Sequence, residues 1–186
     1  MKKLLFVVLA GILFITACKK SSSSSNSSST FTATVSGKAT TFNVISATLL
    51  RSTPDNEKRM DISGTSTDGS KRLIITLGLE SSLGSGMTVK SYVLNPFPED
   101  DPNTPNIDES ATTQGFTTYS TSLGNNNWLT NIYDEQGSFV ISACDSAHTT
   151  VSGTFQTTLT DNTTAPATSV VITSGTISGL KYMVVN

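Results

Sequence analysis

The sequence is poor in the residues from which proteins most often build metal sites and nucleophile–base pairs. Its 186 residues include two cysteines, one histidine and one tryptophan. A structural zinc site needs four ligands, mostly cysteine or histidine, so this composition disfavours one. Charge is also sparse, with 12 basic and 14 acidic residues and a net charge of −2. That weakly acidic balance argues against a nucleic-acid partner, which requires a basic surface.

A hydrophobic run long enough to cross a bilayer is also lacking. The longest uncharged apolar segment, Leu4 to Ile15, has 12 residues. A helix of that length spans about 18 Å, whereas the hydrocarbon core is roughly 30 Å thick. Lys2 and Lys3 precede the segment and small residues follow it. The pattern predicts a signal peptide over residues 1–17.

The residues around the first cysteine make this signal more specific. Ile15-Thr16-Ala17-Cys18 resembles the bacterial lipobox, in which the position three before the cysteine is usually leucine. The resemblance implies that the thiol of Cys18 receives a diacylglycerol, that the chain is cut before it, and that the new amine is acylated, for example by palmitate. The expected location is the cell envelope, anchored in the outer membrane. The alternative is an ordinary secretory signal in which the cysteine is coincidental.

A serine-rich segment follows Cys18. Eight of the 12 residues from Lys19 to Thr30 are serine, so the segment has little apolar surface to bury and is predicted to be disordered. A flexible chain of that length reaches about 20 Å. We therefore expect residues 18–30 to form a lipidated tether and residues 31–186 to form a single domain.

The remainder reads as an all-β protein. No segment shows a sustained helical apolar period, and alternation is common instead, as in Phe31–Val35. Asp68-Gly69 is a hairpin signal before a predicted strand at Lys71–Leu79. Four of its side chains should face the core: Leu73, Ile75, Leu77 and Leu79. Later strands are predicted at Met87–Leu94, Phe116–Ser122, Trp128–Tyr133, Ser138–Cys144, Thr149–Thr160, Ser169–Ile177 and Lys181–Val185. Short turns favour mainly antiparallel pairing, so we expect an antiparallel β-sandwich or a flattened barrel of about ten strands.

The segment from Asn95 to Gln114 differs from the rest. It contains four prolines and five acidic residues, which predicts a long irregular loop, and loops of this length are usually functional or disordered. Its carboxylates are weak candidates for calcium, which takes oxygen ligands, although their spacing matches no EF-hand. The candidates are Glu99, Asp100, Asp101 and Asp108. Paired carboxylates in this loop could alternatively serve a hydrolase.

Two residues near the end of one predicted strand are candidates for a catalytic pair. Cys144 has no disulfide partner if Cys18 is lipidated, and we interpret it as a small buried hydrophobe, with a reactive thiol as the alternative. His148, the only histidine, lies four residues further on. A Cys/His dyad is conceivable, but a surface histidine at a strand start fits this position better.

Aromatic side chains in neighbouring strands suggest a ligand face. Trp128, Tyr119 and Tyr133 lie in strands that the turn at Gly124 to Asn127 should join. Exposed aromatic rings of this kind bind sugars, although aromatic residues in strands more often belong to the core or to cross-strand pairs.

Strand patterns at both ends of the domain carry a family resemblance. Val151-Ser152-Gly153-Thr154-Phe155, the stretch V-I-T-S-G-T-I at 171–177 and the stretch F-T-A-T-V-S-G at 31–37 are similar to small Bacteroidetes lipoproteins with a β-rich domain of unknown function. The resemblance covers most of residues 31–180. It implies an envelope location and a sandwich-like fold, and it supplies no activity and no catalytic residue.

Two further expectations depend on that resemblance. Asp145-Ser146-Ala147 matches the O-glycosylation sequon of exported Bacteroidetes proteins, so Ser146 is a candidate glycan site if the turn exposes it. Surface-exported lipoproteins of the group often carry acidic residues after the cysteine. Lys19 and Lys20 stand there instead, which slightly favours inward-facing display and leaves the membrane leaflet open.

The sequence therefore favours an envelope lipoprotein that acts as a non-enzymatic binding or structural module. Its expected partners are the membrane, through the lipid anchor, and a glycan or another envelope protein. No cofactor and no nucleic acid are expected. The alternative is a hydrolase that uses the carboxylates of residues 95–114.

Overall fold

The computed structural model describes residues 29–54, 56–94, 114–125, 127–130, 134–161 and 165–186. These residues form strands and turns only, so the chain is all-β, as predicted. Within the same ranges no helix is long and apolar enough to cross a membrane. The strands are β1 (Thr30–Val35), β2 (Lys38–Ser52), β3 (Glu57–Ser66), β4 (Lys71–Glu80), β5 (Ser91–Leu94), β6 (Gln114–Gly124), β7 (Asn127–Thr130), β8 (Asp134–Asp145), β9 (Thr150–Asp161), β10 (Thr168–Lys181) and β11 (Met183–Val185).

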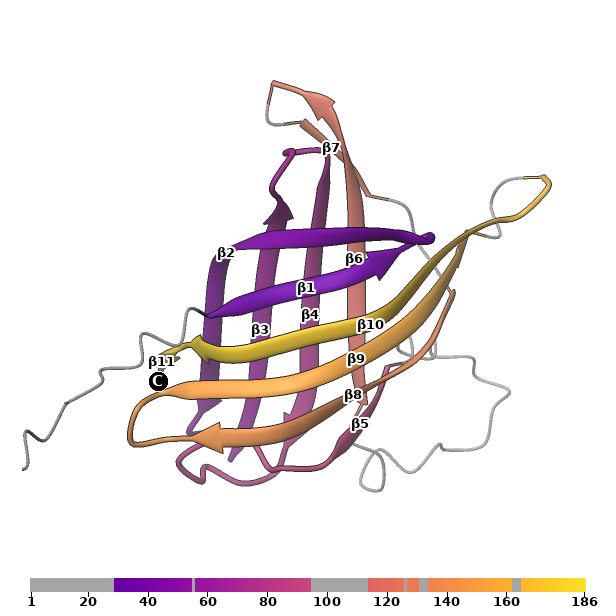
Figure 1. Cartoon of the computed structure of the whole chain (residues 1–186). Helices are drawn as coiled ribbons and strands as arrows, with labels where there is room; N and C mark the ends of the chain where they lie inside the picture. Colours follow the sequence, from indigo (N-terminus) through magenta and orange to yellow (C-terminus); the bar gives the residue numbers. More distant parts are fainter. Residues whose placement is uncertain (1–28, 55, 95–113, 126, 131–133, 162–164) are drawn as a thin grey trace, which may run out of the picture.

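Nine of the strands close into one barrel. Their order is β1-β10-β9-β8-β5-β6-β4-β3-β2, and β2 pairs back with β1 through Thr32↔Thr41 to Val35↔Lys38. The strands β1, β10, β9 and β8 run across β3, β4 and β6, which lie behind them (Figure 1). Because the hydrogen bonding continues around the ring, the molecule is not divided into two separate sheets.

The remaining two strands lie outside the ring. β7 pairs with β6 in the antiparallel hairpin that the sequence predicted, and β11 pairs with β2. Pairing is mostly antiparallel, as expected, but β5–β6 and β11–β2 are parallel. β5 begins at Ser91, four residues later than the predicted strand at 87–94, because Met87 is buried in the core and does not pair with a neighbouring strand.

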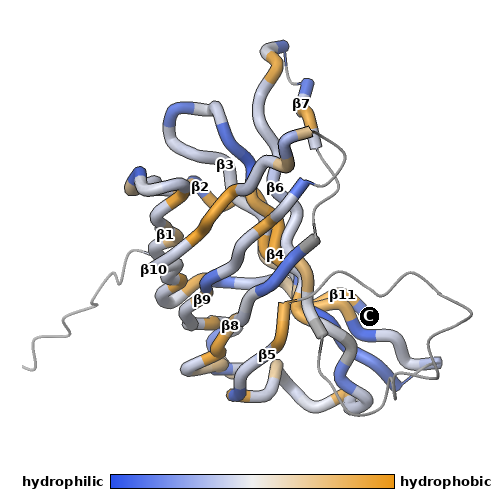
Figure 2. Tube along the Cα trace, turned by 90° about the vertical axis from the view of Figure 1, so that its right-hand side faces the viewer, coloured by the Kyte–Doolittle hydropathy of each residue, from blue (hydrophilic) through white to orange (hydrophobic). Residues whose placement is uncertain are grey.

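The interior follows from the alternation of side chains along the strands, which Figure 2 shows as changing hydropathy along the tube. Leu73, Ile75 and Leu77 are fully buried, as predicted. Aromatic rings fill the centre: Phe31 lies 4.9 Å from Phe42 and 6.0 Å from Phe155, measured between ring centroids. Dense packing of this kind leaves the interior of the barrel occupied by its own side chains.

Glycine makes room for these rings. A Cβ at Gly64 would lie 2.8 Å from the ring of Phe31, and one at Gly175 would lie 2.5 Å from the ring of Phe155. Both distances are shorter than atoms tolerate. The two glycines in β3 and β10 are therefore required by close approach of an aromatic ring.

The two ends of the barrel differ in the turns and segments that form them, and we call them the hairpin end and the plug end. The hairpin end contains the β3–β4 turn at 67–70 and the β6–β7 hairpin, which are joined by a hydrogen bond from the N–H of Ser122 to the carbonyl of Ser70. The plug end contains the β2–β3 turn at 53–56 and the segment Ser81–Lys90 between β4 and β5. Met87 of that segment is buried in the core, so the segment closes this end.

Candidate functional site

The plug end is held by one buried carboxylate, that of Glu80. Its oxygens accept hydrogen bonds from the hydroxyl of Tyr92 at 2.5 Å and from the N–H and hydroxyl of Thr88. The ammonium groups of Lys58 and Lys90 lie 3.1 Å and 3.4 Å from the same carboxylate. These partners come from β3, β5 and the plug segment, so Glu80, which lies in β4, ties four parts of the chain together.

Burial and hydrogen bonding act in opposite directions on Glu80. Burial raises the pKa of its carboxyl group, but the hydrogen bonds from Tyr92, Lys58 and Thr88 outweigh that effect and lower it. The pKa of Tyr92 is raised, first by burial and then by donation to Glu80. Glu80 is therefore held as a carboxylate and Tyr92 as a neutral phenol. We call the cluster of Glu80, Lys58, Tyr92 and Thr88 the latch, because it fixes the plug segment to the barrel and is not a reactive pair.

A shift in register places Glu80 inside the barrel, beside Lys58, which already points inward by alternation with Met60 in β3. Lys58 pairs with Glu80 and Met60 pairs with Leu77, so β4 has one residue more than β3 between these pairs. Such a bulge reverses the face on which the following side chain points. Strict alternation would place Glu80 outside, which is why the sequence pattern did not identify it. The side chain of Leu79, predicted to face the core, lies outside the described side chains.

The plug segment also contacts the far side of the barrel. The side chain of Lys58 donates to the carbonyl of Gly86. A Cβ at Gly86 would lie 2.8 Å from the sulfur of Cys144, and that sulfur lies 3.7 Å from the hydroxyl of Tyr182. Burial, followed by the contact with Cys144, raises the pKa of Tyr182 to about 12. The plug is thus packed between β3 on one side and β8 on the other.

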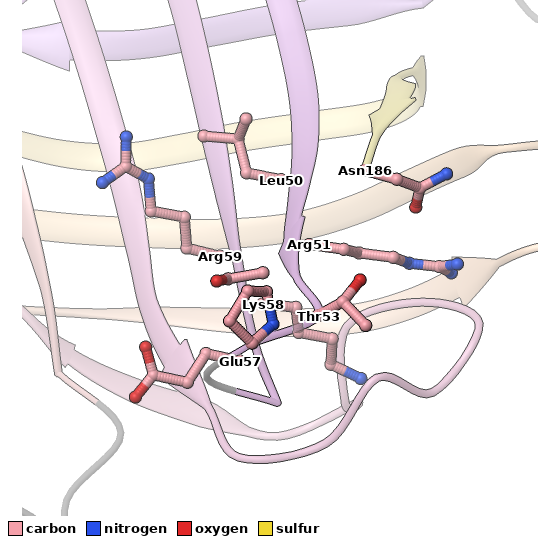
Figure 3. A pocket seen from close by; sticks show the side chains of 9 residues that line it. Leu50, Arg51, Thr53, Glu57, Lys58, Arg59 and Asn186 are labelled. Atoms are coloured by element: carbon pink, nitrogen blue, oxygen red, sulfur yellow. The ribbon is translucent and has the colours of Figure 1, made fainter.

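A pocket of about 510 Å³ opens beside the plug end. It is lined by the β2–β3 turn and the end of the chain, and it includes three basic side chains, Arg51, Lys58 and Arg59. In Figure 3 the guanidinium groups of Arg51 and Arg59 point in opposite directions. Arg51 donates to the carbonyl of Gly84, and Arg59 pairs with Asp61. The positive charges do not converge, so the pocket is not organised to hold an anion.

A second buried carboxylate, Glu135 in β8, has a different environment. It accepts hydrogen bonds from the N–H of Thr117 at 2.6 Å and from the hydroxyl of Thr157 at 2.7 Å. No ion pair to Glu135 occurs among the described residues. Burial raises its pKa, and the hydrogen bonds from Thr117 and Thr157 offset only part of that rise. Neither this group nor Glu80 is open to solvent, so neither is placed to act on an external substrate.

The Cys144 and His148 pair has separate partners. Cys144 is half-buried against the core and is free of any disulfide among the described residues. His148 is exposed, and its Nδ1 lies 2.7 Å from the carboxylate of Asp145 in the β8–β9 turn. The sulfur instead faces Tyr182. The two side chains therefore have different neighbours, as expected for a packed thiol and a surface histidine.

The predicted aromatic ligand face does not form as proposed. Tyr119 points into the barrel and is 5% exposed, because it alternates with the outward residues of β6. Trp128 is half-buried on β7, and Tyr133 lies outside the described residues. Tyr119 was therefore wrongly assigned to this face, and Trp128 is the one member that the structure places near the surface.

Several other predicted residues cannot be compared with the structure. The calcium candidates Glu99, Asp100, Asp101 and Asp108, the proposed hydrolase loop and Cys18 all lie outside the described residues. Among the residues that are described, no three acidic, cysteine or histidine side chains gather as a metal site would require. Ser146 is exposed in the β8–β9 turn, which meets the condition that its predicted glycosylation requires.

Compared with known protein families, with curated proteins and with solved structures, the chain shows no significant match. The resemblance to small Bacteroidetes lipoproteins therefore stays a prediction from the strand patterns.

Proposed function

We propose that this chain is a cell-envelope lipoprotein, anchored in the outer membrane through Cys18, whose barrel is a non-enzymatic binding or structural module. The observation that carries the proposal is where the folded body begins. β1 starts at Thr30, the residue at which the serine-rich segment ends, so signal, anchor, tether and barrel follow one another along the chain. A triply acylated residue releases from a membrane very slowly, because each buried methylene adds about 0.8 kcal/mol.

The filled interior supports a role through the outer surface. The core is a continuous cluster of apolar and aromatic side chains, and the carboxylates of Glu80 and Glu135 are committed to internal hydrogen bonds. A ligand would therefore meet the strand faces, turns and edges. We regard the ring as a flattened barrel, in which the two crossing layers offer broad outer faces to a glycan or another envelope protein.

The anchor is tested by mass spectrometry of the membrane fraction. The wild-type chain should be found there with Cys18 acylated, and a Cys18→Ala variant should move to the soluble fraction. Unmodified wild-type protein in the soluble fraction would contradict the anchor.

The choice between binding and hydrolysis is tested with envelope polysaccharide. A binding module should retain the polysaccharide without creating new reducing ends. Release of reducing ends would favour the alternative hydrolase, whose carboxylates at 95–114 lie outside the described residues. Loss of that release in an Asp100→Asn, Asp101→Asn variant would then assign the activity to the loop.

A further inference from the structure

The β6–β7 hairpin projects from the body of the barrel, as both Figure 1 and Figure 2 show. Leu123 is 67% exposed and Leu129 is 48% exposed. Leu129 stands opposite Thr121, and Trp128 stands opposite Ser122, so leucine and tryptophan occupy the two faces of the ribbon. A projecting ribbon with large apolar side chains on its surface is typical of an element that contacts another apolar phase.

The hairpin is uncharged. Residues 114–130 contain no Asp, Glu, Lys or Arg, although charged residues make up 14% of the chain. The nearest basic residues come from the neighbouring strand, where Lys71 and Arg72 pair with Thr121 and Ser120. The end of the hairpin, residues 124–127, is glycine and asparagine, and the large apolar side chains flank it. The exposed carboxylate of Asp68, in the β3–β4 turn, lies at the same end as Lys71 and Arg72. An uncharged ribbon with a polar end and apolar flanks suits the headgroup region of a bilayer better than its acyl-chain interior.

The root of the tether lies at the side of the barrel, between its two ends, as the start of β1 shows (Figure 1). Ser29 and Thr30 line one groove together with Asn43 and Val44 of β2. The registers then run across the sheet from Asn43 to Thr65, from Thr65 to Arg72, and from Arg72 to Ser120. Three strand spacings amount to about 14 Å. The root is tied as closely to the plug end, because Thr30 stands opposite Ser178, four residues before Tyr182, whose hydroxyl borders Gly86. The anchor therefore holds the barrel near the membrane without selecting an end, and the surface of the hairpin decides which end meets the lipid.

The tether root has apolar surface of its own. Ile45, which follows Val44 in β2, is 56% exposed. The 12 residues from Lys19 to Thr30 can extend to about 40 Å at most, so the hairpin end of the barrel is within reach of the lipid surface.

The outer edge of β7 limits how deep the hairpin can go. β7 pairs only with β6 among the described strands, so its outer backbone groups need water or lipid headgroups as partners. An unpaired edge is not tolerated in the hydrocarbon core. The headgroup region satisfies both requirements, and tryptophan is enriched there because its ring is apolar and its N–H is polar.

We propose that the hairpin end of the barrel rests on the lipid surface, with Leu123, Leu129 and Trp128 in the headgroup region. The proposal rests on the lipid anchor proposed above. It goes beyond that anchor in assigning an orientation to the barrel and a second, non-covalent membrane contact.

The test uses the single tryptophan of the chain, because all tryptophan emission then reports on the hairpin. The full acylated chain is reconstituted into vesicles of phosphatidylethanolamine and phosphatidylglycerol with brominated acyl chains. We expect emission at shorter wavelength and quenching that is stronger for bromine near the headgroups than for bromine near the chain ends. A Leu123→Ser, Leu129→Ser variant should lower the inserted population about tenfold per leucine.

A matched control replaces exposed valines away from the hairpin. Val93→Ser, Val171→Ser removes side chains that are 49% and 43% exposed and should leave the quenching unchanged. Absence of bromine quenching in wild-type protein that is bound to the vesicles and acylated at Cys18 would overturn this inference while leaving the anchor intact. A spectral shift without quenching, accompanied by self-association, would show that a second copy covers the hairpin and would equally overturn it. The mass of Cys18, read separately, tests the anchor alone.

Discussion

Lys58 and Glu80, on the neighbouring strands β3 and β4, form a 3.1 Å ion pair whose side chains are 3% and 5% exposed. A buried ion pair is weak evidence of stability by itself, because removing two charges from water is costly. Here the carboxylate oxygens of Glu80 also accept hydrogen bonds from the hydroxyl groups of Tyr92 and Thr88. The pair is therefore part of a satisfied network that fixes the plug segment to the barrel.

Removing the lysine should loosen the plug end. Lys58→Ala leaves the Glu80 carboxylate with only the half-exposed Lys90 as a cationic neighbour, and breaking a buried pair typically costs about 3–5 kcal/mol. Urea unfolding should show a loss toward the lower end of that range. Arg59→Ala is the control, since Arg59 is exposed and its pair with Asp61 is partly solvated, and it should change the free energy of unfolding by about 0.5 kcal/mol or less. Equal effects of the two changes would contradict the latch.

Glu135 should make the barrel less stable as the pH rises. Its folded pKa is raised by burial, so its contribution is fully present below the unfolded pKa and is lost as the pH rises through the folded value. Glu135→Gln should therefore become progressively more stabilising relative to wild type as the pH rises above 4.5, the ordinary pKa of a glutamate, towards neutral pH. Unfolding free energies measured across that range provide the check, and a pH-independent difference would disprove the assignment.

Glu80 should show the opposite sign. Its pKa is lowered in the folded state, because the hydrogen bonds from Tyr92, Lys58 and Thr88 outweigh burial. Its contribution is present above the unfolded pKa and is lost as the pH falls through the folded value. The destabilisation caused by Glu80→Gln should thus be largest near neutral pH and shrink in acid. A destabilisation that grew in acid would contradict this environment for Glu80.

The alternation of apolar and polar residues predicted the strands well. It failed to predict which side chains point inward where a register shift interrupts the alternation. The alternation of Leu73, Ile75 and Leu77 and the Asp68-Gly69 turn are local signals, and the structure shows both. Glu80 faces inward only because of a register shift against β3. Such a shift depends on a partner strand and leaves no mark in the local sequence.

The aromatic residues show a second limit. Tyr119 and Trp128 are both aromatic residues within predicted strands. Tyr119 points into the barrel, whereas Trp128 lies on the projecting hairpin. Whether a strand side chain points inward depends on which face of the sheet becomes the interior of the barrel. That face is fixed only when all nine strands have paired. Sequence reasoning could therefore place both residues in strands without deciding which one meets solvent.

Gly64 should not accept a side chain. A Cβ there would meet the ring of Phe31 at 2.8 Å and the Cβ of Phe42 at 3.0 Å, and overpacking of this kind costs about 1–3 kcal/mol. Gly64→Ala should lower the unfolding free energy by that amount in urea titrations. Thr65→Ala, on the opposite face of β3, is the control and should cost less than about 1 kcal/mol. A neutral Gly64→Ala would mean that the aromatic centre is looser than the structure shows.

Ser146 is predicted to carry a glycan. Asp145 accepts hydrogen bonds from the N–H groups of Ala147 and His148, so the β8–β9 turn is held by its own first residue and displays Ser146 to solvent. Purified from a bacterium of the resembled group, the wild-type chain should be heavier than Ser146→Ala by the mass of a glycan. Ser36→Ala is the control, because Ser36 is also exposed in a turn but follows a valine.

Asp145→Asn separates recognition of the sequence from exposure of the turn. Asparagine retains a side-chain oxygen that can accept the same two N–H groups, so the turn and the exposure of Ser146 should persist. If the modifying enzyme reads the carboxylate, the glycan is lost in Asp145→Asn as completely as in Ser146→Ala. A glycan retained in Asp145→Asn, or an unmodified wild-type chain, would remove the basis for assigning the sequon.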